Sequence, residues 1–139
     1  MIGVIPNPKK SITVDFPLGA IKEAVTFIRD IDKRYALHSI NDVFNQYTYQ
    51  AGEFLSFGVF IDINLSSQSE TKTQINIEVR RKIGAFDKAF EVQYGNQHIE
   101  NMIICITNAL QMTDAQKATI KEKYKVKEGS ATPEKGLSK

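Results

Sequence analysis

The chain has 139 residues and a net charge of +2, with 42% hydrophobic and 24% charged residues. These values are typical of one soluble globular domain that can bury its own core, and they exclude a wholly disordered chain. The longest apolar runs fall far short of the roughly 20 residues of a spanning helix, and the first ten residues lack a secretory h-region. We therefore expect a cytoplasmic protein without membrane contact.

Cysteine and histidine are too scarce for a disulfide framework or a metal cluster, since the chain has only Cys105, His38 and His98. We expect no metal and no cofactor. Residues 1–112 hold 11 basic and 12 acidic residues, whereas residues 113–139 hold 7 lysines and 4 acidic residues. The basic excess belongs to the C-terminal segment, and the near-neutral body argues against an extended nucleic-acid surface.

The first predicted elements are a short strand and a helix. Residues 11–16 alternate apolar and polar side chains, and Pro17 ends that pattern. Apolar residues then recur at spacings of three and four, including Ile21, Val25 and Ile28, which predicts a helix over residues 18–32.

Residues 35–50 are rich in strand-forming residues, but their alternation changes phase in the middle. Two interpretations fit this pattern, a hairpin that turns near residues 41–45 and one long bulged strand. The Asn41-Asp42 pair favours the hairpin, because both residue types are common in tight turns.

Two long strands follow, over residues 54–65 and 73–83, with apolar side chains at the odd positions. One face of this strand pair is therefore buried. An antiparallel register that places Ile63 opposite Ile75 continues to Arg81 opposite Phe57, at the end of the sheet. Arg81 is a charged residue in an otherwise apolar row.

Residues 84–95 predict a long irregular connection, and a core helix is expected to begin near Asn96, an acceptable N-cap. Thr113 and Gln116 form a capping-box pattern, which predicts a further short helix. From Lys127 onward the composition is typical of a disordered tail. We expect one domain over residues 1–112 and a lysine-rich extension over residues 113–139.

The predicted order is β-α-β-β-β-β-α, with both helices on one face of an antiparallel sheet. This is a two-layer α+β sandwich with a C-terminal extension.

A first candidate site is an anion site at the end of the second long strand. Arg80, Arg81, Lys82 and the helix start at Asn96 could converge there on a phosphate or carboxylate. The alternative interpretation is a rim charge, in which Arg81 pairs with a carboxylate such as Glu100, Asp87 or Glu91.

A second candidate is a partner surface on the outer sheet face and the following connection. Its candidate residues are Tyr47, Phe60, Asp62 and Phe86. Aromatic side chains on a polar sheet can also stack on single-stranded nucleic acid, but the mixed charges are equally typical of a solvated antiparallel sheet.

Catalytic motifs are not recognisable in this sequence. It contains no phosphate-binding glycine loop, no HExxH and no G-x-S-x-G. Cys105 falls in an apolar helical run, which is typical of a core thiol, and His38 and His98 are interpreted as surface or helix-terminal residues. We therefore expect no enzymatic activity.

The path from "SITVDFP" through "FLSFGVFIDINL" and "INIEVRR" to "GNQHIENMIICITNAL" resembles small bacterial domains of TATA-binding-protein-like or helix-grip type. The resemblance covers about residues 10–112 and consists of element order and hydrophobic pattern. It implies a non-enzymatic role in binding or assembly.

These observations predict a non-catalytic interaction or assembly domain. Its partner is expected to be a protein, with a second copy of the chain as one candidate. One alternative is a domain that holds a small anionic or apolar ligand between helix and sheet. Another is nucleic-acid binding through the lysine-rich extension.

Overall fold

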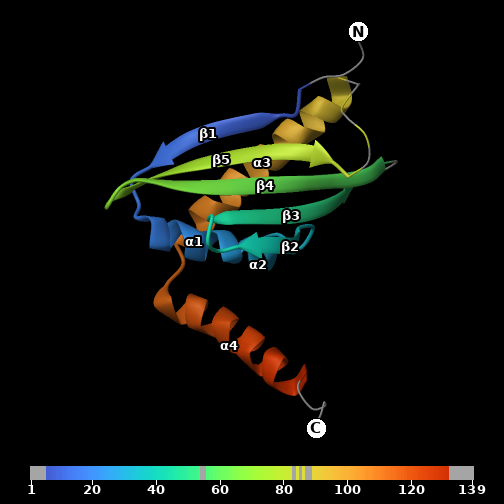
Figure 1. The fold of residues 1–139 in the computed structure, drawn as a ribbon. Helices are drawn as coiled ribbons and strands as arrows, with labels where there is room; N and C mark the ends of the chain where they lie inside the picture. Colours follow the sequence, from blue (N-terminus) through green and yellow to red (C-terminus); the bar gives the residue numbers. More distant parts are fainter. Residues whose placement is uncertain (1–5, 54–55, 83, 85, 87–88, 132–139) are drawn as a thin grey trace.

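The computed structural model describes residues 6–53, 56–82, 84, 86 and 89–131. Its strands are β1 (Lys9–Val14), β2 (Ala36–Asn41), β3 (Gln46–Glu53), β4 (Ser56–Ser69) and β5 (Lys72–Arg81). Its helices are α1 (Leu18–Thr26), α2 (Ile28–Ile31), α3 (Ala89–Leu110) and α4 (Asp114–Ala131). The strands form one antiparallel sheet in the order β1-β5-β4-β3-β2, and α1, α2 and α3 lie on one face of it (Figure 1). The predicted α+β sandwich is confirmed.

The core lies between α3 and the odd-numbered face of the sheet. Val59, Ile61 and Ile63 of β4 are all at most 3% exposed, as alternation predicts. The buried side of α3 follows the helical repeat, with Ile99, Met102, Cys105, Ile106 and Ala109. Burial of these aliphatic side chains stabilises the domain, at roughly 25 cal/mol per Å² of apolar surface.

The hairpin interpretation of residues 35–50 is confirmed. β2 and β3 pair antiparallel and are joined by a turn over residues 42–45, where Asn45 adopts a positive φ of 56°. Asparagine tolerates this left-handed conformation better than most residues. The pairing register also shifts between Leu37 and Ser39, so the strand contains a bulge as well.

The predicted register of β4 and β5 is wrong by two residues. Ile63 faces Ile77 rather than Ile75, and Arg81 faces Val59 rather than Phe57. A turn at residues 70–71, with a bulge between Ser67 and Ser69, sets this alignment. A slip of two residues keeps every side chain on the same face, so the hydrophobic pattern cannot distinguish the two registers.

The predicted start of the core helix is also wrong. α3 begins at Ala89, so Asn96 is an exposed residue inside the helix rather than its N-cap. Gly95 suggested a helix boundary, yet it serves close packing. A Cβ at Gly95 would lie 2.7 Å from Cγ of Pro8, so glycine allows the segment before β1 to approach α3.

The capping box at the start of α4 is confirmed. The Gln116 backbone N–H donates to Thr113 Oγ1 (3.1 Å), and the Thr113 N–H donates to Gln116 Oε1 (2.9 Å). The helix continues to Ala131, into the segment expected to be a disordered tail, of which residues 132–139 lie outside the described residues. Lysines tie α4 to α1, since Lys117 and Lys121 both pair with Glu23.

Candidate functional site

Polar side chains gather at one end of the interface between α3 and the sheet. Ala51 of β3, Val59 of β4 and Arg81 of β5 lie in one row across the sheet, and Tyr35 directly precedes β2 at the same end. We call this region the polar end and define it by a set of buried or half-buried side chains: Tyr35, Arg81, Glu91, His98 and Asn101.

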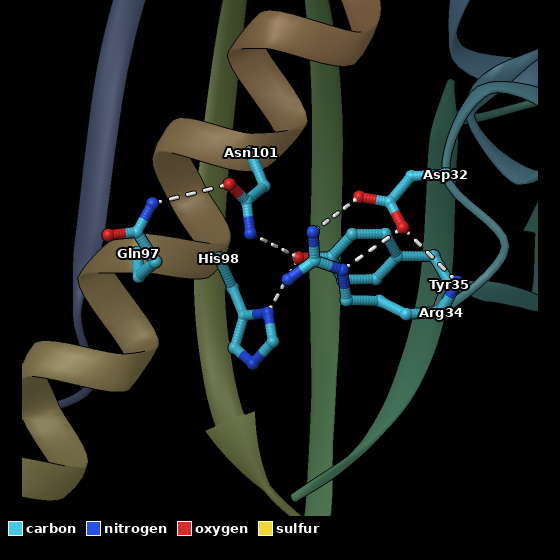
Figure 2. A network of polar contacts seen from close by, with 6 residues as sticks. All are labelled: Asp32, Arg34, Tyr35, Gln97, His98 and Asn101. Atoms are coloured by element: carbon cyan, nitrogen blue, oxygen red, sulfur yellow. Dashed lines mark hydrogen bonds and ion pairs between the residues drawn. The ribbon is translucent and has the colours of Figure 1, made fainter.

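Tyr35 is the centre of a buried hydrogen-bond network (Figure 2). Its hydroxyl lies 2.6 Å from Nδ1 of His98 and accepts a hydrogen bond from Nδ2 of Asn101 at 3.0 Å. Tyr35 is only 2% exposed and His98 only 5%. His98 and Asn101 are three residues apart on α3, and this spacing brings both to the tyrosine hydroxyl.

Asn101 donates to the Tyr35 oxygen. In the second bond of the network, between the Tyr35 hydroxyl and Nδ1 of His98, either atom can be the donor, and the histidine tautomer sets the direction. Burial raises the pKa of Tyr35 to about 12, so the phenol keeps its proton at physiological pH. Tyr35 is therefore suited to hydrogen bonding rather than to proton abstraction.

An ion pair at the rim positions Tyr35. Arg34 donates from Nε to Asp32 Oδ1 at 3.0 Å, and its guanidinium carbon lies 5.6 Å from the centre of the Tyr35 ring. Burial alone would raise the pKa of Asp32, but hydrogen bonds from the side chain and backbone of Arg34 outweigh it and lower that pKa. The Tyr35 backbone N–H also donates to the carbonyl of Asp32, so side-chain and backbone contacts together hold the turn before β2.

Arg81 pairs with Glu91 in the polar end. Its Nη1 lies 3.9 Å from Oε1 of Glu91, and the two side chains are 20% and 17% exposed. Glu91 was one of the three carboxylates expected as a partner. Removing one member of such a half-buried pair leaves the other charge poorly compensated.

The four residues of the predicted anion site do not converge. Arg80 and Lys82 lie on the outer face of the sheet and Arg81 on the inner face, because successive side chains of a strand alternate. Asn96 projects from the interior of α3, not from a helix start. The convergence that this hypothesis requires is therefore absent from the described structure.

Two of the four predicted partner-surface residues are buried, which corrects their placement on the surface. Tyr47 is 2% exposed on the core face of β3, and Phe86 is 1% exposed. Phe60 and Asp62 do lie on the outer face. Arg80 donates to both carboxylate oxygens of Asp62 and its guanidinium lies 4.8 Å from the Phe60 ring centre.

Cys105 is a core residue in the structure. It is 3% exposed, and burial raises its pKa to about 11, so the thiol stays protonated and poorly nucleophilic. Among the described residues, no group of three metal-ligating side chains comes together. Within the same residues, no helix is both long and apolar enough to cross a membrane.

Sequence reasoning missed Tyr35, His98 and Asn101. We interpreted His98 as a surface or helix-terminal residue, whereas it belongs to the buried side of α3. The helical repeat that links His98 to Met102 and Cys105 was available as a signal, because spacings of three and four place residues on one helix face. Nothing local pointed to Tyr35, which is 63 positions away from His98.

No protein-family model matches the chain, and no curated protein matches its sequence. Solved structures do match its fold. A START superfamily protein from Mycobacterium smegmatis has a TM-score of 0.54 at 8% identity, over 77% of this chain and 98% of that one. A Bacillus halodurans protein has a TM-score of 0.54 at 8% identity, over 79% and 100%. The di-domain ARO/CYC protein StfQ, from the steffimycin biosynthetic pathway, has a TM-score of 0.53 at 11% identity, over 75% and 45%.

At these identities the comparisons establish the fold alone. The five-stranded antiparallel sheet with helices on one face is consistent with the helix-grip fold. They support the helix-grip part of the resemblance proposed from the sequence, and the finer TATA-binding-protein-like part gains no support from them.

Proposed function

We propose that this chain binds a small molecule between α3 and the inner face of the sheet, at the polar end. The observation that carries the proposal is the Tyr35–His98–Asn101 network, which brings three polar side chains from two elements together at the edge of a mainly apolar core. Small-molecule sites are typically apolar, with a few convergent polar groups that fix the ligand's orientation.

The surroundings of the network indicate the class of ligand. Ala51 and Val59 line the sheet beside it, and both are small apolar side chains that are 3% exposed. The half-buried Arg81–Glu91 pair lies at the same level of the sheet. We therefore propose a mainly apolar molecule with one hydrogen-bonding group. That group would bond Tyr35, His98 or Asn101 in place of one of the hydrogen bonds that these side chains make to one another.

The fold supports ligand binding over the assembly role that we expected from the sequence. The similar structures include START superfamily and ARO/CYC proteins, which are domains of a ligand-binding type. A fold does not determine a function, so the proposal depends on the network and not on this similarity alone. We propose binding as the role of the polar end, and the Cys105 thiol, which is buried and keeps its proton, is not suited to act as a nucleophile.

Heteronuclear NMR tests this proposal with three probes: naphthol, decanoate and anilinonaphthalene sulfonate. We expect at least one probe to shift the amide signals of Ala51, Val59 and His98. Tyr35→Phe should lower the affinity for that probe by about fivefold or more, since one hydrogen bond to a ligand contributes about 1 kcal/mol.

Tyr49→Phe is the matched control. Tyr49 is equally buried and its hydroxyl donates to the Val25 carbonyl at 2.6 Å, so the variant removes a hydroxyl outside the polar end. Its affinity for the probe should be unchanged. The proposal is wrong if none of the probes binds more tightly than about 1 mM, or if the shifts are confined to the outer face of the sheet.

A further inference from the structure

Glu91 of the polar end has a buried acceptor atom without a hydrogen bond. Its Oε1 is shielded from solvent, and no described residue donates a hydrogen bond to it. Arg81 balances the charge of Glu91, but Nη1 of Arg81 lies 3.9 Å from this oxygen, which is longer than a hydrogen bond. Buried oxygens of this kind are rare in folded proteins and costly, so the atom requires an explanation.

The unbonded oxygen lies inside the interface between α3 and the sheet. Glu91 projects from α3, and its ion-pair partner Arg81 lies on the inner face of the sheet, in one row with Val59 and Ala51. Because solvent does not reach Oε1, this atom is turned toward that row rather than toward the surface. Val59 and Ala51 line the proposed ligand site, so the unbonded oxygen lies at the same level of the sheet as the site.

Glu91 and His98 lie on one side of α3. They are seven positions apart, which is close to two turns of 3.6 residues, so their side chains leave the helix in nearly the same direction. A rise of 1.5 Å per residue separates the two positions by roughly 10 Å along the helix axis. A ligand of about that length, bonded at one end to the Tyr35–His98–Asn101 network, therefore reaches Glu91 with its other end.

The charges beside the unbonded oxygen select the group that it can accept. Arg81 compensates the one negative charge of Glu91. A carboxylate or phosphate on the ligand would bring a second negative charge beside Glu91, and like charges repel strongly in a partly buried site. An ether would leave the oxygen without a donor. A hydroxyl or amine group, in contrast, would donate a hydrogen bond to the carboxylate, and hydrogen bonds to charged groups are the stronger ones.

We propose that the ligand of the polar end carries a hydrogen-bond donor, a hydroxyl or an amine, in addition to the group that bonds the network, and that Glu91 accepts from this donor. Glu91 is then a residue that determines specificity, because it favours ligands with a donor at the far end and disfavours anionic ones. The inference rests on the proposed function, since it requires a ligand between α3 and the sheet.

NMR titration of the wild type with two matched probes tests this inference. One probe is a naphthalene diol with its hydroxyl groups at opposite ends of the ring system. The other is its monomethyl ether, in which one of these groups can no longer donate. The amides of Ala51 and Val59 report the dissociation constants. We expect the diol to bind about tenfold or more tightly than the ether, as a hydrogen bond to a carboxylate predicts.

A double variant, Arg81→Met with Glu91→Met, should abolish this preference. Replacing both members leaves no charge unpaired, and methionine retains much of the packing of both stems. Lys10→Met with Glu100→Met is the matched control. This pair also joins a strand to α3, at 3.3 Å, but its side chains are 48% and 54% exposed, and the control should keep the wild-type preference.

Two results would overturn the inference. One is a wild type that prefers the diol by no more than about twofold, the factor that two equivalent hydroxyl groups supply on statistical grounds alone. The other is a double variant that keeps the full preference. In either case the buried oxygen of Glu91 is bonded by water only. Failure of the proposed function is distinguishable, because then neither probe binds, whereas failure of this inference alone leaves both probes bound. The comparison in the wild type needs no variant, so it decides the matter even if the double variant does not fold.

Discussion

The Tyr35 hydroxyl bonds two buried or half-buried side chains at once, and its removal should therefore cost more than removal of an equally buried hydroxyl that donates to a backbone carbonyl. In Tyr35→Phe, Nδ1 of His98 loses its 2.6 Å partner and Nδ2 of Asn101 loses its 3.0 Å acceptor. A buried polar group without its partner costs about 1–3 kcal/mol, and a half-buried group that can reach water costs less. We expect Tyr35→Phe to lower the free energy of unfolding by about 2–3 kcal/mol.

Tyr49→Phe provides the comparison at matched burial. Tyr49 donates to the carbonyl of Val25 near the end of α1, where helix carbonyls lack intrahelical partners. Loss of this bond should cost about 1 kcal/mol. The free energies of unfolding of the two variants should therefore differ by about 1–2 kcal/mol. This difference measures how much more the Tyr35 hydroxyl contributes because it bonds two side chains of the polar end.

Urea unfolding followed by circular dichroism measures both values. All samples need the same low protein concentration, because association would stabilise the folded state by mass action. A double variant, Tyr35→Phe with His98→Leu, should destabilise by less than the sum of its parts, since the two side chains share one hydrogen bond. The reasoning is refuted if Tyr35→Phe costs no more than Tyr49→Phe.

Three further predictions concern the polar end and the strands beside it. Burial raises the pKa of Tyr35 to about 12, so the stability that the protonated hydroxyl contributes below its ordinary pKa of 10 should be lost as the pH rises toward 12. The free energy of unfolding of the wild type should fall by about 2–3 kcal/mol over this pH range, and that of Tyr35→Phe should not. Arg81→Ala should cost about 1–3 kcal/mol and Arg81→Met less, because methionine retains the packing of the stem, and thermal unfolding that ranks them oppositely would contradict this. Gly58→Ala would place a Cβ 2.5 Å from the Ala51 carbonyl oxygen, at a residue whose φ is +94°. In urea unfolding this variant should lose about 1–3 kcal/mol or more of stability. Gly52→Ala is the control, because nothing lies within 4 Å of the added Cβ, and its stability should change by less than about 0.5 kcal/mol.

Side-chain alternation predicted the layers of this fold but not the alignment of its strands. The odd positions of β4 and β5 face the core as expected. The register depends on the turn at residues 70–71 and on the bulge beside it, and a slip of two residues preserves the buried face. In the predicted register Arg81 faced Phe57, whereas in the structure it faces Val59. The position of this candidate site residue therefore depends on turn geometry, about which the hydrophobic pattern carries no information.

The predicted start of α3 was wrong because the glycine taken as a helix boundary reflects a long-range contact. Gly95 and Asn96 together are typical of a helix start. In the structure Gly95 lies inside the helix, where a Cβ would approach Pro8 to 2.7 Å. Contact with a segment more than eighty residues earlier in the chain therefore explains why glycine occupies position 95. A local sequence pattern contains no information about such a contact.

The site shows the same limit more strongly. Arg81 attracted attention because its charge interrupts an apolar row, and its pairing with Glu91 is one of the arrangements the sequence suggested. The network at Tyr35 produced no such signal, because tyrosine is common in strands and a single histidine on a helix is uninformative. Its members become a unit only when the segment before β2 is placed against α3.

The middle of the helix–sheet interface and its polar end differ in what they contribute. In the middle, Ile63 and Ile77 face each other across β4 and β5 and are at most 1% exposed, so their packing stabilises the domain without polar compensation. At the polar end the same strands reach Val59 and Arg81, and the buried residue on α3 is His98. Buried polar groups stabilise less per residue than well-packed aliphatic ones and are costly when unsatisfied. The buried hydroxyls of Tyr49 and Thr73 donate to backbone carbonyls, whereas the Tyr35 hydroxyl bonds side chains of another element, and the proposed ligand site depends on that difference.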